Sequence, residues 1–519
     1  MTERVVIIGG GIAGLATACL LAKRGAAVVV VEKNGHLGGR ADELRIDGFR
    51  FETGPSWYLM PEAYDHFFEL MGTSTAAELD LQLLDPGYRI YPEHHPLLDV
   101  PFGTDAVADL FESLEPGAGD ALRDYLASAA DVYDIALDRF LYTTFSSLRP
   151  FLHRDVIARA FTLAVLLLQP LQCYVDKRFR DPRLRQILQY PAVFLSSQPR
   201  DTPSLYHLMS HTDLTLGVRY PQGGFSGIVA ALERLARTHG VEFLLEHEAT
   251  RIEVIDGSTT GVHVHSDSGE LFLPADAVVA ASDLHHTESS LLPESARTYS
   301  EAHFKRHNPG VSCVLALVGV RGELPELLHH TLFFSEDWDE DFNAVFPSSG
   351  GGGSRGASRS IYVCKPSATD PTVAPSGCEN LFVLIPVAAD PSLGHGDAYG
   401  AAESPRVAAI VDATLDLIAT RTGVADLRER VVVKRTIGPA DFAGRYYSFA
   451  GGAIGPAHTL RQSAFFRGRN VSAKVDNLYY AGQTTVPGVG VPMCLISAEN
   501  VVKRMLGLRD ASPLTQTQI

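Results

Sequence analysis

RVVIIGGGIAGLATACLLAKRGAAVVVVEKNGHLGGR (residues 4–40) decides the fold, because it predicts a buried strand, a glycine turn, a helix and a second strand. Gly9, Gly11 and Gly14 have GxGxxG spacing, which permits a tight turn, close approach of backbone to a pyrophosphate, and close packing of helix on strand. The helix expected over residues 12–24 would direct its free N–H groups at that pyrophosphate. The stretch therefore predicts a bound dinucleotide.

An acidic residue at the end of the second strand supports this interpretation. Glu32 stands 18 residues after Gly14, where a carboxylate accepts hydrogen bonds from ribose hydroxyls and disfavours a 2′-phosphate. Gly38-Gly39-Arg40 follows. The GxGxxG turn, the acid and the GGR turn together resemble the two-domain FAD flavoproteins of the amine oxidase and carotenoid desaturase superfamily. That resemblance implies FAD as the cofactor and a contact between Arg40 and its pyrophosphate.

Length and composition limit the remaining possibilities. A chain of 519 residues is too large for one core and predicts two or three domains. The net charge of −17 disfavours a nucleic-acid partner. The six cysteines form no CxxC pair, so we expect a reducing compartment and no metal site. The chain opens directly into the nucleotide strand, and we therefore expect no signal peptide and a cytoplasmic location.

Three further segments narrow the resemblance to the bacterial phytoene desaturases. They are GFRFETGPSW (residues 48–57), PSATDPTVAP (residues 366–375) and NLYYAGQTTVPGVGVPMCLIS (residues 477–497). The first implies a glycine-proline turn beside the flavin. In the last, a helix expected to begin near Pro492 offers a second N-terminus to the cofactor. This segment departs from the family pattern at Gln483, Thr484 and Val486, which leaves the exact substrate open.

The residues expected to bind FAD come from these segments and from a strand edge at residues 248–252 that would pass the adenine. They are Gly9, Gly11, Gly14, Glu32, Lys33, Gly39, Arg40, Gly54, Pro55, Ser56, Ala249, Gly482, Gln483, Gly490, Val491 and Pro492.

The predicted fold class is α/β, with a discontinuous Rossmann-like FAD-binding domain and an inserted substrate domain made of a mixed sheet and helices. We assign residues 1–90, 220–290 and 471–508 to the FAD-binding domain and residues 91–219 and 291–470 to the substrate and membrane-associating domain. Residues 348–360, SSGGGGSRGASRS, predict a flexible surface loop, and residues 509–519 a disordered tail.

An uncharged apolar run, residues 161–175, lies in the predicted helical part of the substrate domain. It is shorter than the roughly 20 residues that a bilayer span needs, and Pro170 interrupts it. Two interpretations stay open: a buried pair of helices, or a helix that dips into one leaflet or lines a lipid entry. We expect a peripheral protein on the inner face of the cell membrane.

The resemblance implies an FAD-dependent enzyme of carotenoid synthesis that inserts double bonds into an acyclic polyene such as phytoene or the shorter diapophytoene. The oxidation would be a hydride transfer from an allylic carbon, followed by loss of a proton. Oxygen or a quinone would reoxidise the flavin. The sequence does not identify the proton acceptor. The resemblance offers Asp138 and Arg139 as candidates, and His207, His211, His285 and His286 are others.

Three alternatives remain open. An amine oxidase would share the GxGxxG and GGR turns but should lack the GFRF…GPSW and PGxG segments together. A carotenoid ketolase, hydroxylating oxygenase or 3,4-desaturase would keep nearly all of these motifs. A non-catalytic prenyl-binding chaperone, similar to the Rab GDP-dissociation inhibitors, would have lost the flavin contacts, whereas Glu32 and Arg40 are present.

Overall fold

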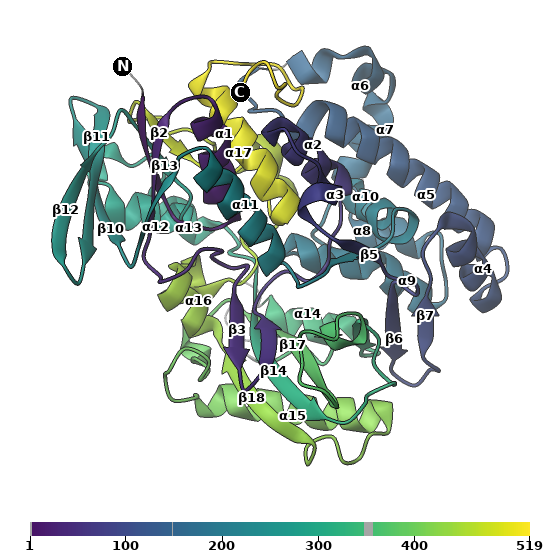
Figure 1. Cartoon of the computed structure of the whole chain (residues 1–519). Helices are drawn as coiled ribbons and strands as arrows, with labels where there is room; N and C mark the ends of the chain where they lie inside the picture. The colour runs from purple at the N-terminus through teal and green to yellow at the C-terminus, as the bar shows by residue number, and fades with distance from the viewer. Residues whose placement is uncertain (1–2, 148, 347–355) are drawn as a thin grey trace.

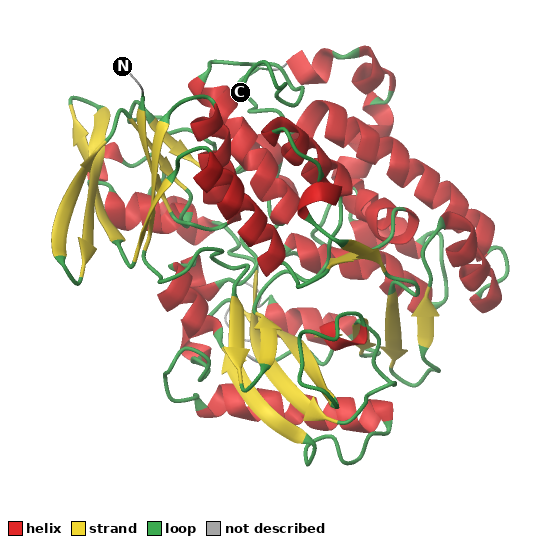
Figure 2. Cartoon of the chain, viewed as in Figure 1, coloured by secondary structure: helices red, strands yellow, loops and turns green. Residues whose placement is uncertain are grey.

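The computed structural model describes residues 3–147, 149–346 and 356–519, and it contains two large sheets with helices around them (Figure 1, Figure 2). Most of the expected loop at residues 348–360 lies outside the described residues. The first sheet is parallel, in the order β19-β13-β1-β2-β9. Its strands are β1 (Arg4–Ile8), β2 (Ala27–Glu32), β9 (Glu242–Leu245), β13 (Ala277–Ala280) and β19 (Leu478–Tyr480). Three distant parts of the chain therefore meet in one sheet, as predicted.

Both faces of this sheet are covered, which explains why its strands are continuous apolar runs. Val5 and Ile7 face a core shared with three helices: α1 (Ile12–Lys23), α11 (Ser226–Thr238) and α17 (Val491–Met505). Val6 and Ile8 pack on the other side against the antiparallel sheet of β10 (Glu248–Ile255), β11 (Ser258–Ser266) and β12 (Gly269–Pro274). Figure 1 shows α17, in yellow, beside α1, in purple.

The second large sheet is mixed, in the order β18-β14-β17-β16-β15-β6-β7. Its strands are β6 (Tyr88–Pro92), β7 (Leu98–Val100), β14 (Val311–Arg321), β15 (His330–Phe334), β16 (Ile361–Cys364), β17 (Cys378–Ala388) and β18 (Val431–Ile437). Helix α15 (Pro405–Thr422) buries Val407, Val411 and Leu415 against one face. Leu315, Phe382 and neighbouring side chains of the other face point toward the helical region.

The helical region follows β7 and forms the right side of Figure 1. It comprises α4 (Thr104–Leu114), α5 (Ala118–Ile135), α6 (Arg154–Ala158), α7 (Ala160–Leu168), α8 (Leu171–Asp176), α9 (Pro182–Gln189) and α10 (Leu208–Ser210). Pro170 is the N-cap of α8 and separates it from α7, so the apolar run is two short helices. Within the described ranges, every helix is too short or too polar to cross a bilayer.

Shorter elements join these layers. They are the hairpin β3 (Glu43–Ile46) and β4 (Phe49–Glu52), the pair β5 (Leu81–Leu83) and β8 (Arg219–Pro221), and the helices α2 (Pro61–Met71), α3 (Thr75–Glu78), α12 (Leu284–His286), α13 (Glu301–Arg306), α14 (Trp338–Val345) and α16 (Pro439–Tyr446). The domain boundary expected at residue 90 falls inside β6, because β6 pairs with β15 in the second sheet.

The C-terminal residues 509–519, expected to be a disordered tail, instead pack against α17. The ammonium group of Lys503 is buried and donates hydrogen bonds to the carbonyl oxygens of Asp510 (2.9 Å) and Ser512 (2.7 Å). Leu514 is buried, and its amide donates to Glu499 Oε2 at 3.0 Å. A buried cation needs acceptors, and the tail supplies them.

Candidate functional site

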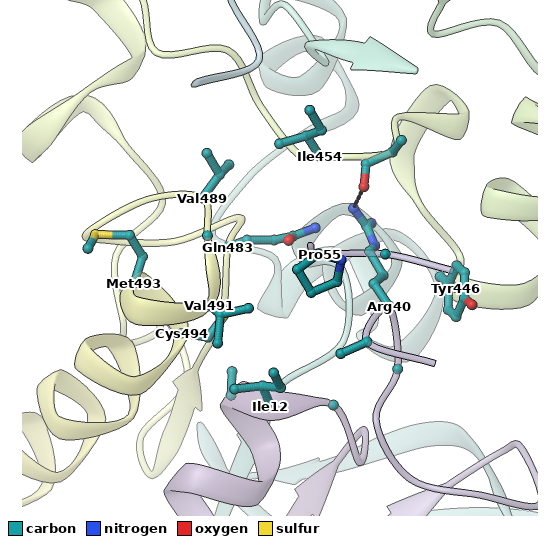
Figure 3. A pocket seen from close by; sticks show the side chains of 18 of the residues that line it. Ile12, Arg40, Pro55, Tyr446, Ile454, Gln483, Val489, Val491, Met493 and Cys494 are labelled. Atoms are coloured by element: carbon teal, nitrogen blue, oxygen red, sulfur yellow. Dashed lines mark hydrogen bonds between the residues drawn. The ribbon is translucent and has the colours of Figure 1, made fainter. Parts of the chain in front are cut away.

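A cavity of about 520 Å³ lies where the first sheet, the face of the second sheet and the helical region meet. One part of its wall is glycine turns and helix N-termini, including Gly11 and Gly490. The other part is apolar or aromatic, including Leu315, Phe382 and Met60. Figure 3 shows Ile12 of α1, Val491 of α17, and Gln483 and Val489 of the second glycine turn around this space. Such a mixture suits a ligand with a charged end and an apolar environment.

The first glycine turn has no room for side chains where the chain crosses itself. Gly9 has φ +104°, and a Cβ on Gly14 would lie 2.0 Å from the Gly9 carbonyl oxygen. Gly11 differs, because a Cβ there would meet only Gly38 O and Gly39 Cα, both at 3.8 Å. Gly14 is therefore required by the fold, whereas the bare Cα of Gly11 leaves space on the cavity side for a ligand.

Glu32 ends β2 and is buried at the edge of this turn. Its Oε2 accepts a hydrogen bond from the Gly10 amide at 2.8 Å, and Oε1 accepts from the amide (2.9 Å) and the Nδ2 (2.7 Å) of Asn34. The carboxylate is thus fixed in place by backbone and side-chain donors. Since two carboxylate oxygens offer about four acceptor sites, one remains for a ribose hydroxyl.

Arg40 lies across the cavity from the first helix, as Figure 3 shows. Its Nη1 donates to Ala453 O at 2.7 Å and its Nη2 to Ser448 Oγ at 2.9 Å, while Asp283 Oδ2 lies 4.0 Å away. Burial lowers the pKa of Arg40, and the nearby Asp283 partly opposes that shift. The guanidinium keeps donors for an anionic ligand, because these contacts do not use all five of its N–H groups.

The second glycine turn, residues 482–490, leads into α17. The Gly482 amide donates to Ser497 Oγ at 2.9 Å, and the buried Asn470 Nδ2 donates to the carbonyl oxygens of Tyr480 (3.2 Å) and Val486 (3.0 Å). Gly490, with φ +113°, is the N-cap of α17. The N-termini of α1 and α17 therefore open on one cavity, which suits a dinucleotide with a pyrophosphate.

A stack of side chains closes the end of the cavity near β10. Lys33 Nζ lies 3.5 Å from the centre of the Tyr447 ring, and the His286 ring stacks on Tyr447 at 4.0 Å between centroids. The Tyr447 hydroxyl donates to Glu248, which precedes Ala249 on β10. Burial and then the nearby Lys33 lower the pKa of His286 to about 4, so this imidazole is neutral near pH 7.

Every residue that the sequence analysis assigned to FAD lines this cavity, except Gly14, which lies behind the wall. The catalytic candidates Asp138 and Arg139 do not line it. Both lie on a π-helical turn, Ala136–Leu141, whose Ala136 and Leu141 do face the cavity. Arg139 instead pairs with Asp155, with 3.1 Å between Nε and Oδ2. The turn directs apolar side chains inward and the charged pair outward.

The four histidine candidates also differ in whether they line the cavity. His207 is buried, but its Nε2 lies 3.0 Å from Ser128 Oγ, away from the cavity wall. His211 packs against Tyr133, and His285 pairs with Glu301 at 3.1 Å. Of these four candidates only His286 lines the cavity, at its nucleotide end.

A buried polar group supports the wall beside the glycine-proline turn. The Tyr362 hydroxyl lies 2.7 Å from Ser56 Oγ and 2.7 Å from His330 Nδ1, and the His330 ring stacks on Trp57 at 4.3 Å.

The ligand-type atoms of His329, His330 and Cys364 lie within 4.8 Å of one another, a spacing compatible with a metal ion, which the sequence did not predict. Burial lowers the pKa of His329 to about 3 and raises that of Cys364 to about 12.

Sequence reasoning missed Tyr447, Asn470 and His458, all of which support or line the cavity. Each stands in a segment of the chain without glycine spacing or an acidic partner to mark it. Contacts with distant parts of the chain bring them to the site: Tyr447 contacts Glu248 on β10, Asn470 contacts Tyr480 on β19, and His458 contacts Leu195. No local pattern would have found them.

Comparison with known proteins identifies the family. The family described as flavin containing amine oxidoreductase matches residues 12–506. Carotenoid 3,4-desaturase of Haloarcula japonica is 41% identical over 504 residues, covering 97% of this chain and 98% of its own. The zeta-carotene-forming phytoene desaturase of Myxococcus xanthus is 33% identical over 510 residues (97% and 94%). The 4,4′-diapophytoene desaturase of Staphylococcus aureus is 28% identical over 508 residues (97% and 98%).

Solved structures agree on the fold. An oxidoreductase from Methanosarcina mazei superposes with a TM-score of 0.59 at 16% identity, covering 96% of this chain and 100% of the other. Putrescine oxidase bound to putrescine gives 0.59 at 14% identity, covering 98% and 99%. With the cavity geometry, these comparisons lead to one conclusion: the chain belongs to the flavin containing amine oxidoreductases and, within them, to the carotenoid desaturases, as an FAD-dependent oxidoreductase acting on CH–CH groups.

Proposed function

We propose that this enzyme inserts double bonds into an acyclic carotenoid precursor, phytoene or a partly desaturated derivative. The observation that carries the proposal is the continuity of one cavity from the two helix N-termini to an apolar wall formed by both domains. A hydrocarbon offers no polar group to hold, so its binding depends on buried apolar surface, at about 0.8 kcal/mol per methylene. FAD, when bound, supplies the acceptor for the hydride.

In this proposal fifteen of the sixteen residues assigned above to FAD, all except Gly14, hold the cofactor, with Glu32 at the adenosine ribose and Arg40 at the pyrophosphate. Leu315, Phe382 and Leu384 of the second sheet and Met60, Leu141 and Leu208 of the helical side would orient the polyene and exclude water. Water exclusion matters because a cation formed on the substrate would otherwise be captured by water.

A second reaction, desaturation at the 3,4 position of a carotenoid, is favoured by the 41% identity to the Haloarcula enzyme. Expression in a host that makes phytoene, and separately in one that makes lycopene, distinguishes the two by chromatography of the pigments. New polyenes only from phytoene support phytoene desaturation, and new polyenes only from lycopene support the 3,4 reaction. Unchanged pigments in both hosts, with flavin bound to the protein, would refute the proposal.

We also propose that the enzyme takes its substrate from a membrane surface on the cytoplasmic side. The observation is a set of exposed apolar side chains, here called the apolar cap: Leu152, Ile157, Phe161, Val165, Leu167, Leu168, Phe465 and Phe466. Phe161 is 84% exposed and Leu168 74%. The Tyr206 hydroxyl donates to Ser463 at 3.0 Å, which joins the segment before Phe465 to the cavity wall. Exposed apolar side chains that form a contiguous surface are typical of membrane or partner contacts.

The electron acceptor that reoxidises the flavin is proposed to be oxygen or a membrane quinone. The apolar cap favours the quinone, because both the polyene and a quinone dissolve in the bilayer. Reduced enzyme mixed with a soluble quinone under argon, or with oxygenated buffer, would give the two reoxidation rates. The faster rate at physiological concentrations identifies the acceptor.

A further inference from the structure

The reaction proposed above needs a proton acceptor, and none of the sequence candidates provides one at the apolar part of the cavity. Among the described titratable residues that line the cavity, most are unsuited. The carboxylates and His286 lie at the nucleotide end, and Cys313 is a thiol whose pKa burial raises. The buried tyrosines, such as Tyr133 and Tyr362, are protonated donors.

His458 has the right tautomer for a proton acceptor. It is 4% exposed, and its Nδ1 lies 3.1 Å from the carbonyl oxygen of Leu195. A carbonyl oxygen can only accept, so the proton of the neutral imidazole must be on Nδ1. Nε2 then carries a lone pair, and no described residue forms a hydrogen bond with it.

The position of Nε2 is set by the second glycine turn. A Cβ on Gly488 would lie 2.4 Å from His458 Nε2, so the imidazole occupies the space that a side chain at Gly488 would fill. Pro487 and Val489, on either side of Gly488, line the same cavity as His458. Figure 3 labels Val489 and Gln483 of this turn, together with Ile454. The lone pair thus lies beside the turn that leads into α17, close to the expected flavin end.

The surroundings keep this imidazole neutral. Burial and the positive charge of Arg467 lower the pKa of His458 far below its usual value, while the Leu195 carbonyl opposes that shift. Arg467 is held away by hydrogen bonds to the Gln483 (2.6 Å) and Thr485 (3.1 Å) carbonyl oxygens, and the Tyr206 ring packs edge-on at 5.6 Å. A weak base is sufficient here, because a carbocation is a far stronger acid than an imidazolium.

We propose that His458 is the catalytic proton acceptor of the desaturation, an inference that rests on the proposed function. After an allylic C–H bond has given its hydride to the flavin, the neighbouring C–H bond breaks. Its electron pair becomes the second bond of the new double bond, and its proton goes to Nε2 of His458. The imidazolium then releases the proton to water when the product leaves.

The test uses the FAD-loaded enzyme and two variants. In His458→Asn the side-chain amide can still donate to Leu195 O, but no lone pair replaces Nε2. The matched control is His207→Asn, which changes a buried histidine outside the cavity. Formation of the more unsaturated polyene is followed by its absorbance under argon in a single turnover, alongside flavin reduction, with unlabelled substrate and with substrate deuterated at the carbon that loses the proton.

We expect His458→Asn to keep its flavin and to lose about 10²–10⁴-fold in the single-turnover rate of product formation, with a larger isotope effect at the deuterated carbon. The His207 control should stay within about threefold of wild type. A His458→Asn rate within threefold of wild type would overturn the inference, as would a loss without any change in the isotope effect. If His458→Asn binds no flavin, His458→Gln is tested in the same way, and loss of flavin there too would make the residue structural.

The same experiment separates failure of the inference from failure of the proposed function. If wild-type enzyme leaves its flavin oxidised with every acyclic carotenoid offered, the desaturase proposal is wrong and the role of His458 falls with it. If wild type reacts and the Asn variant matches it, only the role of His458 is wrong.

Discussion

The two walls of the cavity are built on different principles. The nucleotide wall uses backbone: two glycine turns, two helix N-termini and a few fixed side chains such as Glu32 and Arg40. The polyene wall uses apolar side chains from many elements, including Phe382 on β17 and Leu208 on α10. A charged ligand is recognised by polar groups at fixed positions, whereas a hydrocarbon requires only a complementary apolar shape and the exclusion of water. Substitutions on the nucleotide wall should therefore have large effects on folding or cofactor binding. Substitutions on the polyene wall should have small, graded effects.

The largest effect is expected for Gly14→Ala, on the nucleotide wall. A Cβ there would lie 2.0 Å from the Gly9 carbonyl oxygen, so the turn or the helix must move. We expect a loss of about 3 kcal/mol or more in the free energy of unfolding and little folded protein. Thermal unfolding measures this. The matched control, Gly444→Ala, puts its methyl group in open space and should leave the melting temperature unchanged or raise it.

Gly11→Val should remove the cofactor without removing the fold. The nearest atoms to a Cβ at Gly11 are 3.8 Å away, so the branched side chain extends into the ligand space. We expect a folded apoprotein with no flavin absorption and a circular dichroism spectrum like that of wild type. A yellow Gly11→Val protein would show that the pyrophosphate does not lie at this turn.

Glu32→Ala tests the ribose contact and should have a graded effect. Loss of charged hydrogen bonds should weaken FAD binding by about 1–3 kcal/mol. Fluorescence titration of the apoprotein with FAD gives the dissociation constant. Equal dissociation constants for wild type and variant would contradict the assignment, and Glu43→Ala, an acid outside the cavity wall, serves as the control.

Asp213 tests how an apolar environment affects an ionisable group. This carboxyl is buried, with Oδ2 accepting from Tyr190 (2.7 Å) and Tyr88 (3.1 Å), and burial raises its pKa from 3.8 to about 7. The folded state therefore binds a proton that the unfolded state releases, so stability is greatest below about pH 4 for this group and falls as pH rises to 7. Asp213→Asn should remove about 1–2 kcal/mol of that decline between pH 5 and 7.

The measurement is chemical unfolding at pH 5, 6 and 7. An exposed acid, Asp138, provides the control variant Asp138→Asn, which should keep the wild-type slope. An unchanged slope in Asp213→Asn would mean that the carboxyl is ionised in the folded protein.

The smallest effect is expected at the apolar cap. Phe161→Ser removes an 84% exposed ring and should weaken binding to liposomes of anionic lipid by about 1 kcal/mol, a few-fold change. Flotation with such liposomes measures the bound fraction. Leu271→Ser, at an exposed leucine on β12, is the control. Wild-type protein that never floats would leave the cap as a surface without a membrane role.

Much of the nucleotide wall was predictable because its information is local. The spacing of Gly9, Gly11 and Gly14 and the position of Glu32 follow from the geometry of one strand, one turn and one helix. The prediction for Asp138 and Arg139 as catalytic candidates is not supported by their placement, because a π-helical turn directs them out of the cavity. Their sequence neighbours gave no sign of this turn.

The sequence by itself determined that this chain binds a dinucleotide, since the glycines and the acid lie within one strand, turn, helix and strand of about forty residues. Only the tertiary structure decided where the apolar run at residues 161–175 lies, that the C-terminal tail covers Lys503, and that His458 meets Gly488. Those contacts join residues far apart in the chain. They depend on how whole layers pack against one another, and short-range sequence patterns do not encode that packing.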